Sequence, residues 1–451
     1  MKKIVTIGTG ILVLCYMIGM FIFQDRFYFR SYINGVSCGG KTVKSVELEM
    51  AEKVKQYELT IKGKNGVEDT IESKDIRLFY VSDRTLQKLK DKQPAYNWLF
   101  GSLQKDTDSM RINVTFSKKK LNQVVDGLAF FNKNNVIKSK VPQIKYEKGK
   151  LEIKKAVYGT EVKKDILKAA IIEAIESGKK ELELEQLDCY VKPKYDEKDK
   201  NFLKAYQTME RYIATNITYD FEDRTETLDG KQIFSWLSID KNFKVTISEE
   251  KQIDFIRELE RQYNTLGLSR QFTTYDGRTI SVPSGNYGYM ISRSRELEQM
   301  TKDIKEGKTV KREPEYAYRG YIRKKDDIGN TYVEVDLTNQ RMYFFVNGSL
   351  YVETDVVTGD LARQMGTPDG VYGVTYKERN AILKGPNYRT EVSYWMPFNQ
   401  SIGIHDAGWR SKFGGEIYKT QGSHGCVNTP PENARKIFEK IEQGMPVIVH
   451  Y

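Results

Sequence analysis

The hydrophobic residues at the N-terminus form one unbroken run. From Ile4 to Phe23 the chain has about 20 residues without a charge, enough to cross a bilayer as a single helix. The run ends in bulky residues, MFIFQDRF, where a signal peptidase requires small ones, so we predict an uncleaved transmembrane anchor over residues 4–24. Lys2 and Lys3 favour a cytoplasmic N-terminus, which would place the rest of the chain outside the membrane.

Two later stretches share one helical pattern of apolar residues. They read VYGTEVKKDILKAAIIEAIESGKK and NYGYMISRSRELEQMTKDIKEGKT, and the opening and closing glycines are 19 positions apart in both. Each pattern stops at a glycine, Gly178 or Gly307, which suits a left-handed helix C-cap. The sequence therefore predicts an internal repeat of two α+β modules, residues 45–195 and 198–318.

Turn signals divide the alternating segments of both modules. Asn65-Gly66 lies between alternating apolar and polar residues, LTIKGKNGVEDTI, and predicts a hairpin. In the second module, NITYDFEDRTETLDGKQIFSWL predicts a strand, a turn at Asp229-Gly230 and a short helix.

Alternation with a period of two dominates the C-terminal part of the chain. TYVEVDLTNQRMYFFVNGSLYVETDVVTG predicts strands around a turn at Asn347-Gly348. Short strands with glycine-rich turns continue to residue 428, as in a β-sandwich or barrel. The predicted fold class is α+β: two α+β modules followed by a mostly-β, sandwich-like domain over residues 329–451.

One helix is expected inside that last domain. Thr429 and Glu432 predict a capping box at its start, and Pro430 and Pro431 suit its first turn. Gly444 predicts its end, before a final strand PVIVHY.

The formal net charge of the 451-residue chain is +11, which favours anionic polymers, membrane surfaces or nucleic acids as neighbours. Because no arginine-rich block or nucleic-acid motif accompanies the charge, we interpret it as a solvated lysine-rich surface and expect no nucleic-acid partner.

The four cysteines do not form a disulfide framework. Cys15 lies in the predicted anchor, which leaves an odd number outside: Cys38, Cys189 and Cys426. Even if Cys38 pairs with Cys189, Cys426 remains a free thiol. The chain has no C-x-x-C motif, so we predict no metal site and no cofactor.

Cys426 lies in the stretch GSHGCVN, close to two of the three histidines of the chain. A neighbouring imidazole turns a thiol into a nucleophile, and either His424 or His405 fits this role by spacing alone. Gly425 predicts a tight bend that aims backbone N–H groups at one point, as an oxyanion hole requires. The third histidine, His450, lies in the terminal strand and is expected to be structural.

His405, seventeen further residues and then Ser423-His424-Gly425-Cys426-Val427-Asn428 resemble the signature of L,D-transpeptidases with a YkuD-type catalytic domain. The resemblance covers residues 329–451 and includes VEVDLTNQRMYFFVNG, TPDGVYGV, YWMPF and IGIHDAGWR. The two repeats resemble the peptidoglycan-binding-like modules that accompany such domains in Gram-positive bacteria.

The resemblance implies a specific reaction. Cys426 would attack the carbonyl between the third residue of a peptidoglycan stem tetrapeptide and its terminal D-Ala, leaving a thioester. A side-chain amine of a second stem would then attack, linking two third-position diamino acids. His405 would be the base, Ser423 would orient the site, and His424 and Gly425 would frame the oxyanion hole.

The resemblance also implies further contacts. Carbapenems would acylate Cys426. Many members carry Arg where this chain has Asn428. We expect Asn428 to bind substrate through hydrogen bonds, but without the charge that would hold a substrate carboxylate. Tyr394 and Trp395 are expected either to line a substrate groove or to lie in the core.

Two other functions stay open from the sequence. One is an L,D-carboxypeptidase, in which water replaces the acceptor amine. The other is a non-catalytic cell-wall-binding protein, against which the presence of both His405 and Cys426 argues. For either enzyme we expect a single-pass protein with its catalytic domain in the cell wall.

Overall fold

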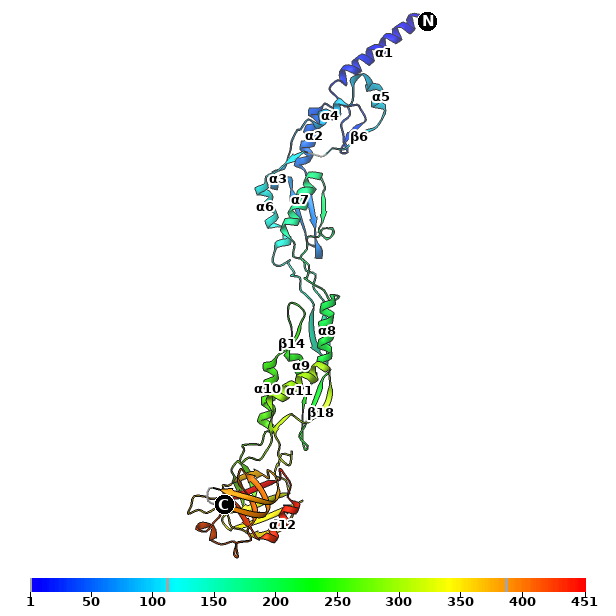
Figure 1. Cartoon of the computed structure of the whole chain (residues 1–451). Helices are drawn as coiled ribbons and strands as arrows, with labels where there is room; N and C mark the ends of the chain where they lie inside the picture. Colours follow the sequence, from blue (N-terminus) through cyan, green and yellow to red (C-terminus); the bar gives the residue numbers. More distant parts are fainter. Residues whose placement is uncertain (1, 111–112, 386–387) are drawn as a thin grey trace. The chain divides into compact units, whose positions relative to one another are not determined.

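The structure, a computed structural model, describes residues 2–110, 113–385 and 388–451, with side chains from residue 7 onward. The chain divides into two compact units (Figure 1). The first comprises Met1–Ile144 with Ile153–Asp199, and the second Lys145–Glu152 with Lys200–Tyr451.

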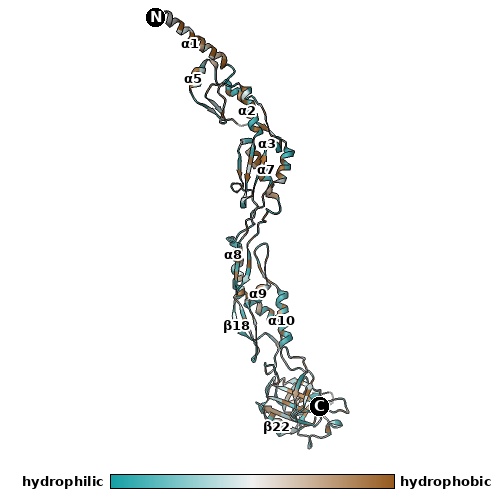
Figure 2. Cartoon of the chain, turned by 180° about the vertical axis from the view of Figure 1, so that it is seen from behind, coloured by the Kyte–Doolittle hydropathy of each residue, from teal (hydrophilic) through white to brown (hydrophobic). Residues whose placement is uncertain are grey.

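The N-terminal helix α1 (Lys2–Ile22) is largely hydrophobic (Figure 2). Its C-terminal end packs against protein: Nε1–H of Trp98 donates to the carbonyl of Tyr16 over 3.2 Å, and Phe23 stacks on Trp98 with 5.4 Å between ring centroids. Within the described residues, no helix is both long and apolar enough to span a membrane. The expected transmembrane anchor over residues 4–24 is therefore not supported.

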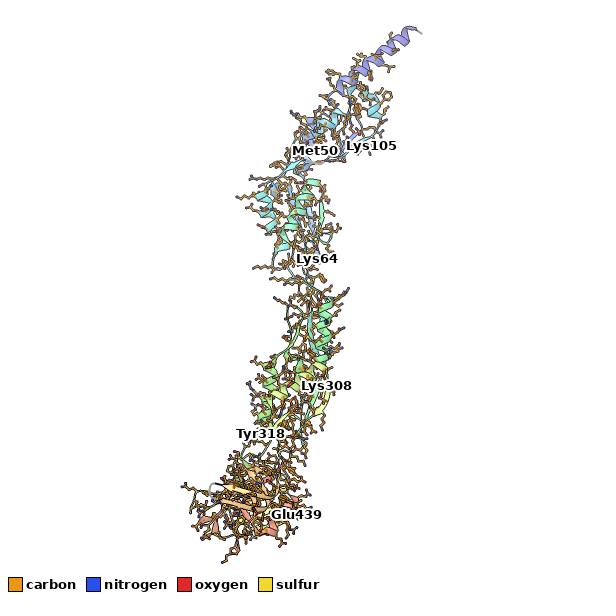
Figure 3. The ribbon with its side chains drawn as sticks, viewed as in Figure 1. Met50, Lys64, Lys105, Lys308, Tyr318 and Glu439 are labelled. Carbon is orange, nitrogen blue, oxygen red and sulfur yellow. The ribbon has the colours of Figure 1, made fainter. Side chains whose placement is uncertain are left out.

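A small hydrophobic cluster follows α1. Its buried side chains include Phe27, Ile33, Cys38 and Met50, the last labelled in Figure 3. All four cysteines of the chain are free thiols. The elements of this region are β1 (Ser31–Ile33), β2 (Val36–Ser37), α2 (Val43–Lys55), α4 (Thr85–Asp91), α5 (Trp98–Leu103) and β6 (Asp106–Asp108).

The lysines labelled in Figure 3 illustrate how the positive charge is distributed. The side chains of Lys105 and Lys308 are exposed, and Lys308 forms an ion pair with Glu306 over 2.7 Å. Such solvated, partly paired charges match the interpretation of a lysine-rich surface.

The predicted internal repeat is confirmed by two three-stranded sheets of the same topology. In each, a central strand pairs antiparallel with the strand after it and parallel with a strand that follows a 14-residue helix. Both helices end at the predicted glycine, Gly178 with φ 72° or Gly307 with φ 70°. The elements are β3 (Glu58–Lys62), β4 (Glu68–Glu72), α7 (Lys164–Ser177) and β10 (Glu181–Glu183) in the first module, and β11 (Asn216–Asp220), β12 (Thr225–Leu228), α11 (Arg293–Glu306) and β18 (Thr309–Arg312) in the second.

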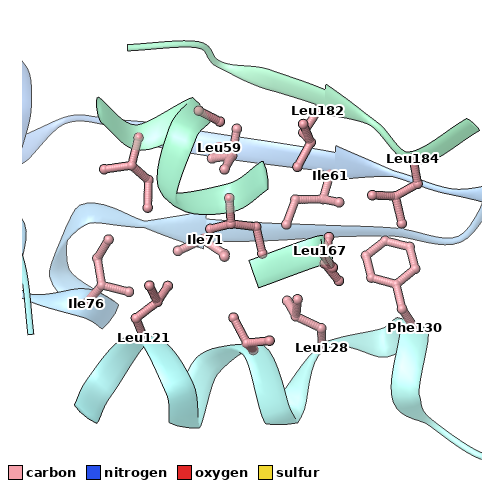
Figure 4. Close-up of a cluster of buried hydrophobic side chains, with 14 of the residues drawn as sticks. Leu59, Ile61, Ile71, Ile76, Leu121, Leu128, Phe130, Leu167, Leu182 and Leu184 are labelled. Carbon is pink, nitrogen blue, oxygen red and sulfur yellow. The ribbon is translucent and has the colours of Figure 1, made fainter. Parts of the chain in front are cut away.

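The sheet of the first module forms its core with two helices, α6 (Lys118–Gly127) and α7 (Figure 4). Leu59, Ile61 and Ile71 of the sheet are fully buried against Leu121 and Leu167 of the helices. Each such side chain contributes about 1.5–3 kcal/mol when it leaves water, so this layer stabilises the module.

The turn predicted at Asp229-Gly230 is wrong. The strands β11 and β12 are joined at residues 221–224, where Glu222 adopts φ 73°. Asp229 instead caps the short helix α9 (Gly230–Trp236), because its carboxylate accepts from the backbone N–H of Gln232 over 2.9 Å. The Asp-Gly pair thus starts a helix, because Asp is a favoured N-cap residue as well as a turn residue.

Two sheets enclose the core of the C-terminal domain, confirming the expected β-rich fold. A five-stranded sheet has the order β22-β21-β20-β28-β23, and a four-stranded sheet has the order β24-β25-β26-β27. Asn347 and Gly348, with φ 50° and 79°, form the predicted turn between β21 and β22. The strands are β20 (Tyr332–Asp336), β21 (Arg341–Val346), β22 (Ser349–Asp355), β23 (Gly370–Gly373), β24 (Glu378–Gly385), β25 (Tyr388–Asn399), β26 (Ile402–Asp406), β27 (Val427–Thr429) and β28 (Pro446–His450).

The helix of this domain, α12 (Pro431–Lys440), exists as predicted, but the expected capping box is wrong. Pro430 occupies the N-cap position, and the Thr429 hydroxyl donates to the carbonyl of Val427 over 3.3 Å. The helix ends at Lys440, and Gly444 lies in the following turn. Pro431 at the first helical position fixes the start in place of a side-chain cap.

A hairpin of the second module, β15 (Arg270–Thr273) and β16 (Thr279–Val282), packs on the five-stranded sheet within the second unit. Phe272 and Val282 are buried with Val371 and Ile448 of that sheet. The hairpin and the sheet thus share one hydrophobic cluster.

Candidate active site

A cavity of about 200 Å³ opens where the strands β25, β26 and β27 meet. It brings together most of the residues singled out from the sequence. Its walls consist of Leu383, Tyr388, Thr390, His405, Trp409, Arg410, Gly422, Ser423, His424, Cys426 and Asn428.

Strand pairing places His405 at the centre of this site. In the parallel pair β26–β27, His405 lies in register with Asn428, and in the antiparallel pair β25–β26 it lies opposite Trp395. Cys426 immediately precedes β27. Seventeen residues lie between His405 and Ser423, and a parallel connection brings them back to the same sheet edge.

A chain of hydrogen bonds fixes the state of the His405 ring. Nε–H of Arg410 donates to Oδ1 of Asn428 over 3.0 Å, and Nδ2 of Asn428 contacts Nε2 of His405 at 3.1 Å. Nδ1 of His405 lies 2.8 Å from the backbone carbonyl of Asp406. Since arginine only donates and a carbonyl only accepts, Asn428 must present its NH₂ to the ring, and the ring carries its proton on Nδ1. Nε2 is therefore the unprotonated nitrogen, and it accepts from the Asn428 amide.

The surroundings keep this imidazole neutral. Burial is the main reason that the pKa of His405 lies below its usual value; the Asp406 carbonyl opposes this shift, and the positive charge of Arg410 adds to it. The rings of Trp395 and Trp409 lie at 5.9 Å from the imidazole, measured between centroids. A neutral ring with an unprotonated Nε2 is the form that can accept a proton.

Cys426 is also buried and uncharged. Burial raises the pKa of its thiol to about 11, although the backbone N–H of Gly403 opposes the shift. The thiol lies 3.6 Å from the carbonyl of Ser401. The resting pair is thus a neutral thiol and a neutral imidazole, so the thiolate has to form during the reaction.

The bend before Cys426 is held by Ser423. Its Oγ donates to the carbonyl of Cys426 over 2.5 Å and accepts from the N–H of Gly425 over 3.1 Å. Gly425 has φ 114°, a conformation that favours glycine. The N–H of Gly425 is already bound to Ser423. Among the described residues, the N–H groups of His424 and Cys426 are the backbone donors of the bend that have no acceptor.

The His424 ring lies at the mouth of the cavity and not beside the thiol in the core. It is exposed and stacks on Tyr388 of β25, with 4.6 Å between the ring centroids and 26° between the ring planes. Its ring is thus placed to line the substrate entrance.

The two expected groove residues do not line the cavity among the described residues. Trp395 is buried with Cys426 and contacts the ring of His405. Tyr394 packs on Phe438 of α12. Neither is among the described residues that line the cavity, so their predicted role in substrate binding finds no support in this geometry.

Several lining residues were missed from the sequence, among them Tyr388, Trp409 and Arg410. Trp409 and Arg410 stand four and five positions after His405, in the stretch IGIHDAGWR. Their nearness to the candidate base was the available signal. Tyr388 lies on a hairpin whose register the sequence did not reveal.

Among the described residues, no cluster of histidine, cysteine or acidic side chains forms a metal site.

Residues 330–449 match the model of an L,D-transpeptidase catalytic domain, and residues 70–183 and 195–311 match that of a putative peptidoglycan binding domain. No match was found among curated proteins. Among solved structures, the crystal structure of a cysteine-to-serine mutant of the Enterococcus faecium L,D-transpeptidase is 34% identical. That match covers 56% of this chain and 100% of the other, with a TM-score of 0.47.

Two further structures are similar. The Ldtfm–avibactam carbamoyl enzyme is 34% identical over 55% of this chain and 98% of the other, with a TM-score of 0.47. The NMR structure of the catalytic domain of the E. faecium L,D-transpeptidase acylated by ertapenem is 44% identical over 27% of this chain and 98% of the other, with a TM-score of 0.26.

Proposed function

The chain belongs to the L,D-transpeptidase family, and on this premise we propose that Cys426 is the nucleophile of the reaction and His405 its general base. The observation that carries this assignment is that a buried thiol and a neutral imidazole with an unprotonated Nε2 line the same cavity. His424, the alternative base, has its ring stacked on Tyr388 instead.

The first half-reaction forms a thioester. Nε2 of His405 takes the proton of the Cys426 thiol as Sγ attacks the carbonyl that precedes the terminal D-Ala of a stem tetrapeptide. The N–H groups of His424 and Cys426 stabilise the negative charge that develops on the carbonyl oxygen. The intermediate then breaks its C–N bond, and the His405 imidazolium gives its proton to the leaving amine of D-Ala.

The second half-reaction forms the crosslink. A side-chain amine of a second stem attacks the thioester, His405 takes a proton from it, and the Cys426 sulfur leaves and is reprotonated. The products are a peptide bond between two third-position diamino acids and the regenerated thiol. Transfer to an amine is the activity of the family, so the carboxypeptidase alternative, with water as acceptor, is not favoured.

We infer that the two modules, which match putative peptidoglycan binding domains, contact the same polymer as the catalytic domain. This inference places the catalytic domain in the cell wall. Relatives acylated by ertapenem and carbamoylated by avibactam support β-lactams and related acylating agents as inhibitors that bind Cys426.

One assay tests the whole proposal. The purified chain incubated with stem tetrapeptides should release D-Ala and form dimers detectable by mass spectrometry, and Cys426→Ala should do neither. Release by both proteins would refute the role of Cys426. Tripeptides without dimers would instead indicate that water is the acceptor.

A further inference from the structure

The cavity beside Cys426 carries one fixed charge. Among the described residues that line it, Arg410 is the only permanently charged one, and none is a carboxylate. Burial lowers the pKa of Arg410, but a guanidinium stays protonated at neutral pH. The cavity that contains the nucleophile therefore also contains a cation.

The protein itself does not neutralise this cation. The two hydrogen bonds of the guanidinium among the described residues go to uncharged oxygens: Oδ1 of Asn428 at 3.0 Å and the carbonyl of Gln421 at 3.0 Å. A guanidinium has five N–H donors, so about three remain for a ligand.

Two acidic side chains of the same region are engaged elsewhere. Asp360 forms an ion pair with Arg363 at 3.8 Å, and Asp406 accepts from the backbone N–H of Tyr394 over 2.8 Å. In the part of the chain that the structure describes, no carboxylate forms an ion pair with Arg410. A half-buried charge without a counter-ion is costly to maintain, which indicates that its partner arrives with the substrate.

We propose that Arg410 binds the terminal carboxylate of the donor peptide, the one that belongs to the D-residue expelled when Cys426 is acylated. This inference rests on the proposed function, because it takes the donor and the leaving residue from it. A guanidinium suits this task because its planar fork matches both oxygens of a carboxylate.

The hydrogen bonds that link His405 through Asn428 to Arg410 indicate which carboxylate of the stem peptide Arg410 binds. The leaving amine must lie at Nε2 of His405 to receive its proton, and the carboxylate is two bonds from that amine. Asn428 links Nε2 to the guanidinium through contacts of 3.1 and 3.0 Å. Arg410 is thus on the leaving-group side of the scissile bond, where only the terminal residue of the donor fits.

The contact would make Arg410 a specificity residue. A donor with one more residue would carry its carboxylate about 3.8 Å further from the attacked carbonyl and place a neutral amide at the guanidinium. Arg410 therefore selects donors whose scissile bond is their last peptide bond.

The test compares two synthetic stem tetrapeptides, one ending in the free D-Ala carboxylate and one in the D-Ala amide, on the full chain. The readout is the ratio of kcat/KM for release of the terminal residue from the acid and from the amide. The wild type should prefer the acid by roughly 10- to 100-fold, as for loss of a hydrogen bond to a charged group. Arg410→Gln should bring the ratio to about 1, and Arg410→Lys should leave an intermediate ratio.

Arg435→Gln is the matched control, because Arg435 lies on α12, exposed and paired with Glu439 at 2.7 Å. It should keep the wild-type ratio. If Arg410→Gln slows both donors equally and keeps the acid preference, the carboxylate assignment is overturned and Arg410 is a positioning residue for Asn428. A wild type without acid preference overturns it too.

If the proposed function itself were wrong, the experiment would give a different result. In that case, neither donor is cleaved by the wild type or by Arg435→Gln, and ertapenem does not acylate Cys426. Acylation of Arg410→Gln by ertapenem, followed by mass spectrometry, shows that the variant is folded with a working nucleophile. This control and the Arg410→Lys variant ensure that a changed ratio of kcat/KM does not simply reflect a misfolded protein.

Discussion

The side-chain amide of Asn428 donates a hydrogen bond to Nε2 of His405 over 3.1 Å. This contact gives a role to the position where many L,D-transpeptidases carry arginine. Asn428 does not replace that charge. It connects the imidazole to Arg410, which supplies a positive charge from a different segment of the chain.

Asn428→Asp should raise the pKa of His405. A carboxylate has no hydrogen to donate, so an unprotonated Nε2 would face its lone pairs, whereas an imidazolium would be stabilised. The acid limb of the pH profile for ertapenem acylation should move to higher pH by about 1 unit or more. Asn428→Ala removes the contact without adding charge and should slow acylation without that displacement. An unmoved acid limb in Asn428→Asp would argue against this contact.

The rate at which the Cys426 thiol reacts with small alkylating agents should increase steadily with pH. Since the pKa of Cys426 is raised to about 11, the rate with iodoacetamide should climb about tenfold per pH unit between pH 7 and 9 without a plateau. His405→Ala should abolish D-Ala release but leave this profile nearly unchanged, because a neutral imidazole contributes no charge. A plateau below pH 8 would indicate a preformed thiolate–imidazolium pair instead.

Ser423→Ala should weaken both the fold and the reaction. It leaves the N–H of Gly425 and the carbonyl of Cys426 without a partner in a buried bend, at a cost of about 1–3 kcal/mol. D-Ala release should fall by roughly 10- to 100-fold, since the N–H groups of the bend lose their alignment. Urea unfolding and the release assay measure the two effects. Ser411→Ala, at an exposed position of the same domain, should change neither.

The buried pair of His450 and Glu334 should make stability depend on pH. Burial by itself lowers the pKa of His450, but the hydrogen bond to Glu334 at 3.1 Å and the negative charges nearby outweigh it and raise the pKa above 6.5. The stabilisation is then complete below pH 6.5 and is lost as pH rises through the folded-state pKa.

Glu334→Gln should therefore destabilise the chain more at pH 6 than at pH 9, by about 1–3 kcal/mol in the free energy of unfolding. Urea titrations at the two pH values measure the difference. An equal loss at both would show that His450 is neutral in the native state.

The hairpin of the second module should contribute to the stability of the C-terminal domain. Phe272→Ala removes a ring buried with Val371 and Ile448, which should cost about 3–5 kcal/mol. Thr273→Ala, on the exposed face of the same strand, should stay within about 0.5 kcal/mol of the wild type. If urea unfolding found the two variants alike, the hairpin would be a loosely attached element.

The parts predicted well were those set by local pattern. The repeat, the Asn347-Gly348 hairpin and the glycine caps follow from period and turn chemistry, which act within a few residues. The predictions of a capping box at Thr429 and of a turn at Asp229 were wrong, because each of these sequence signals occurs in two kinds of local structure. The positions of Trp395 outside the cavity lining and of Arg410 within it depend on strand register across the sheet, which no local pattern encodes.

The neutral resting state of Cys426 also bears on how long the enzyme survives. Peroxide and other oxidants attack thiolates far faster than thiols. A nucleophile that becomes anionic only while a substrate is being attacked spends almost all of its time in a form that oxidants leave alone. The burial that raises the pKa of the thiol is thus also a form of protection against oxidative inactivation.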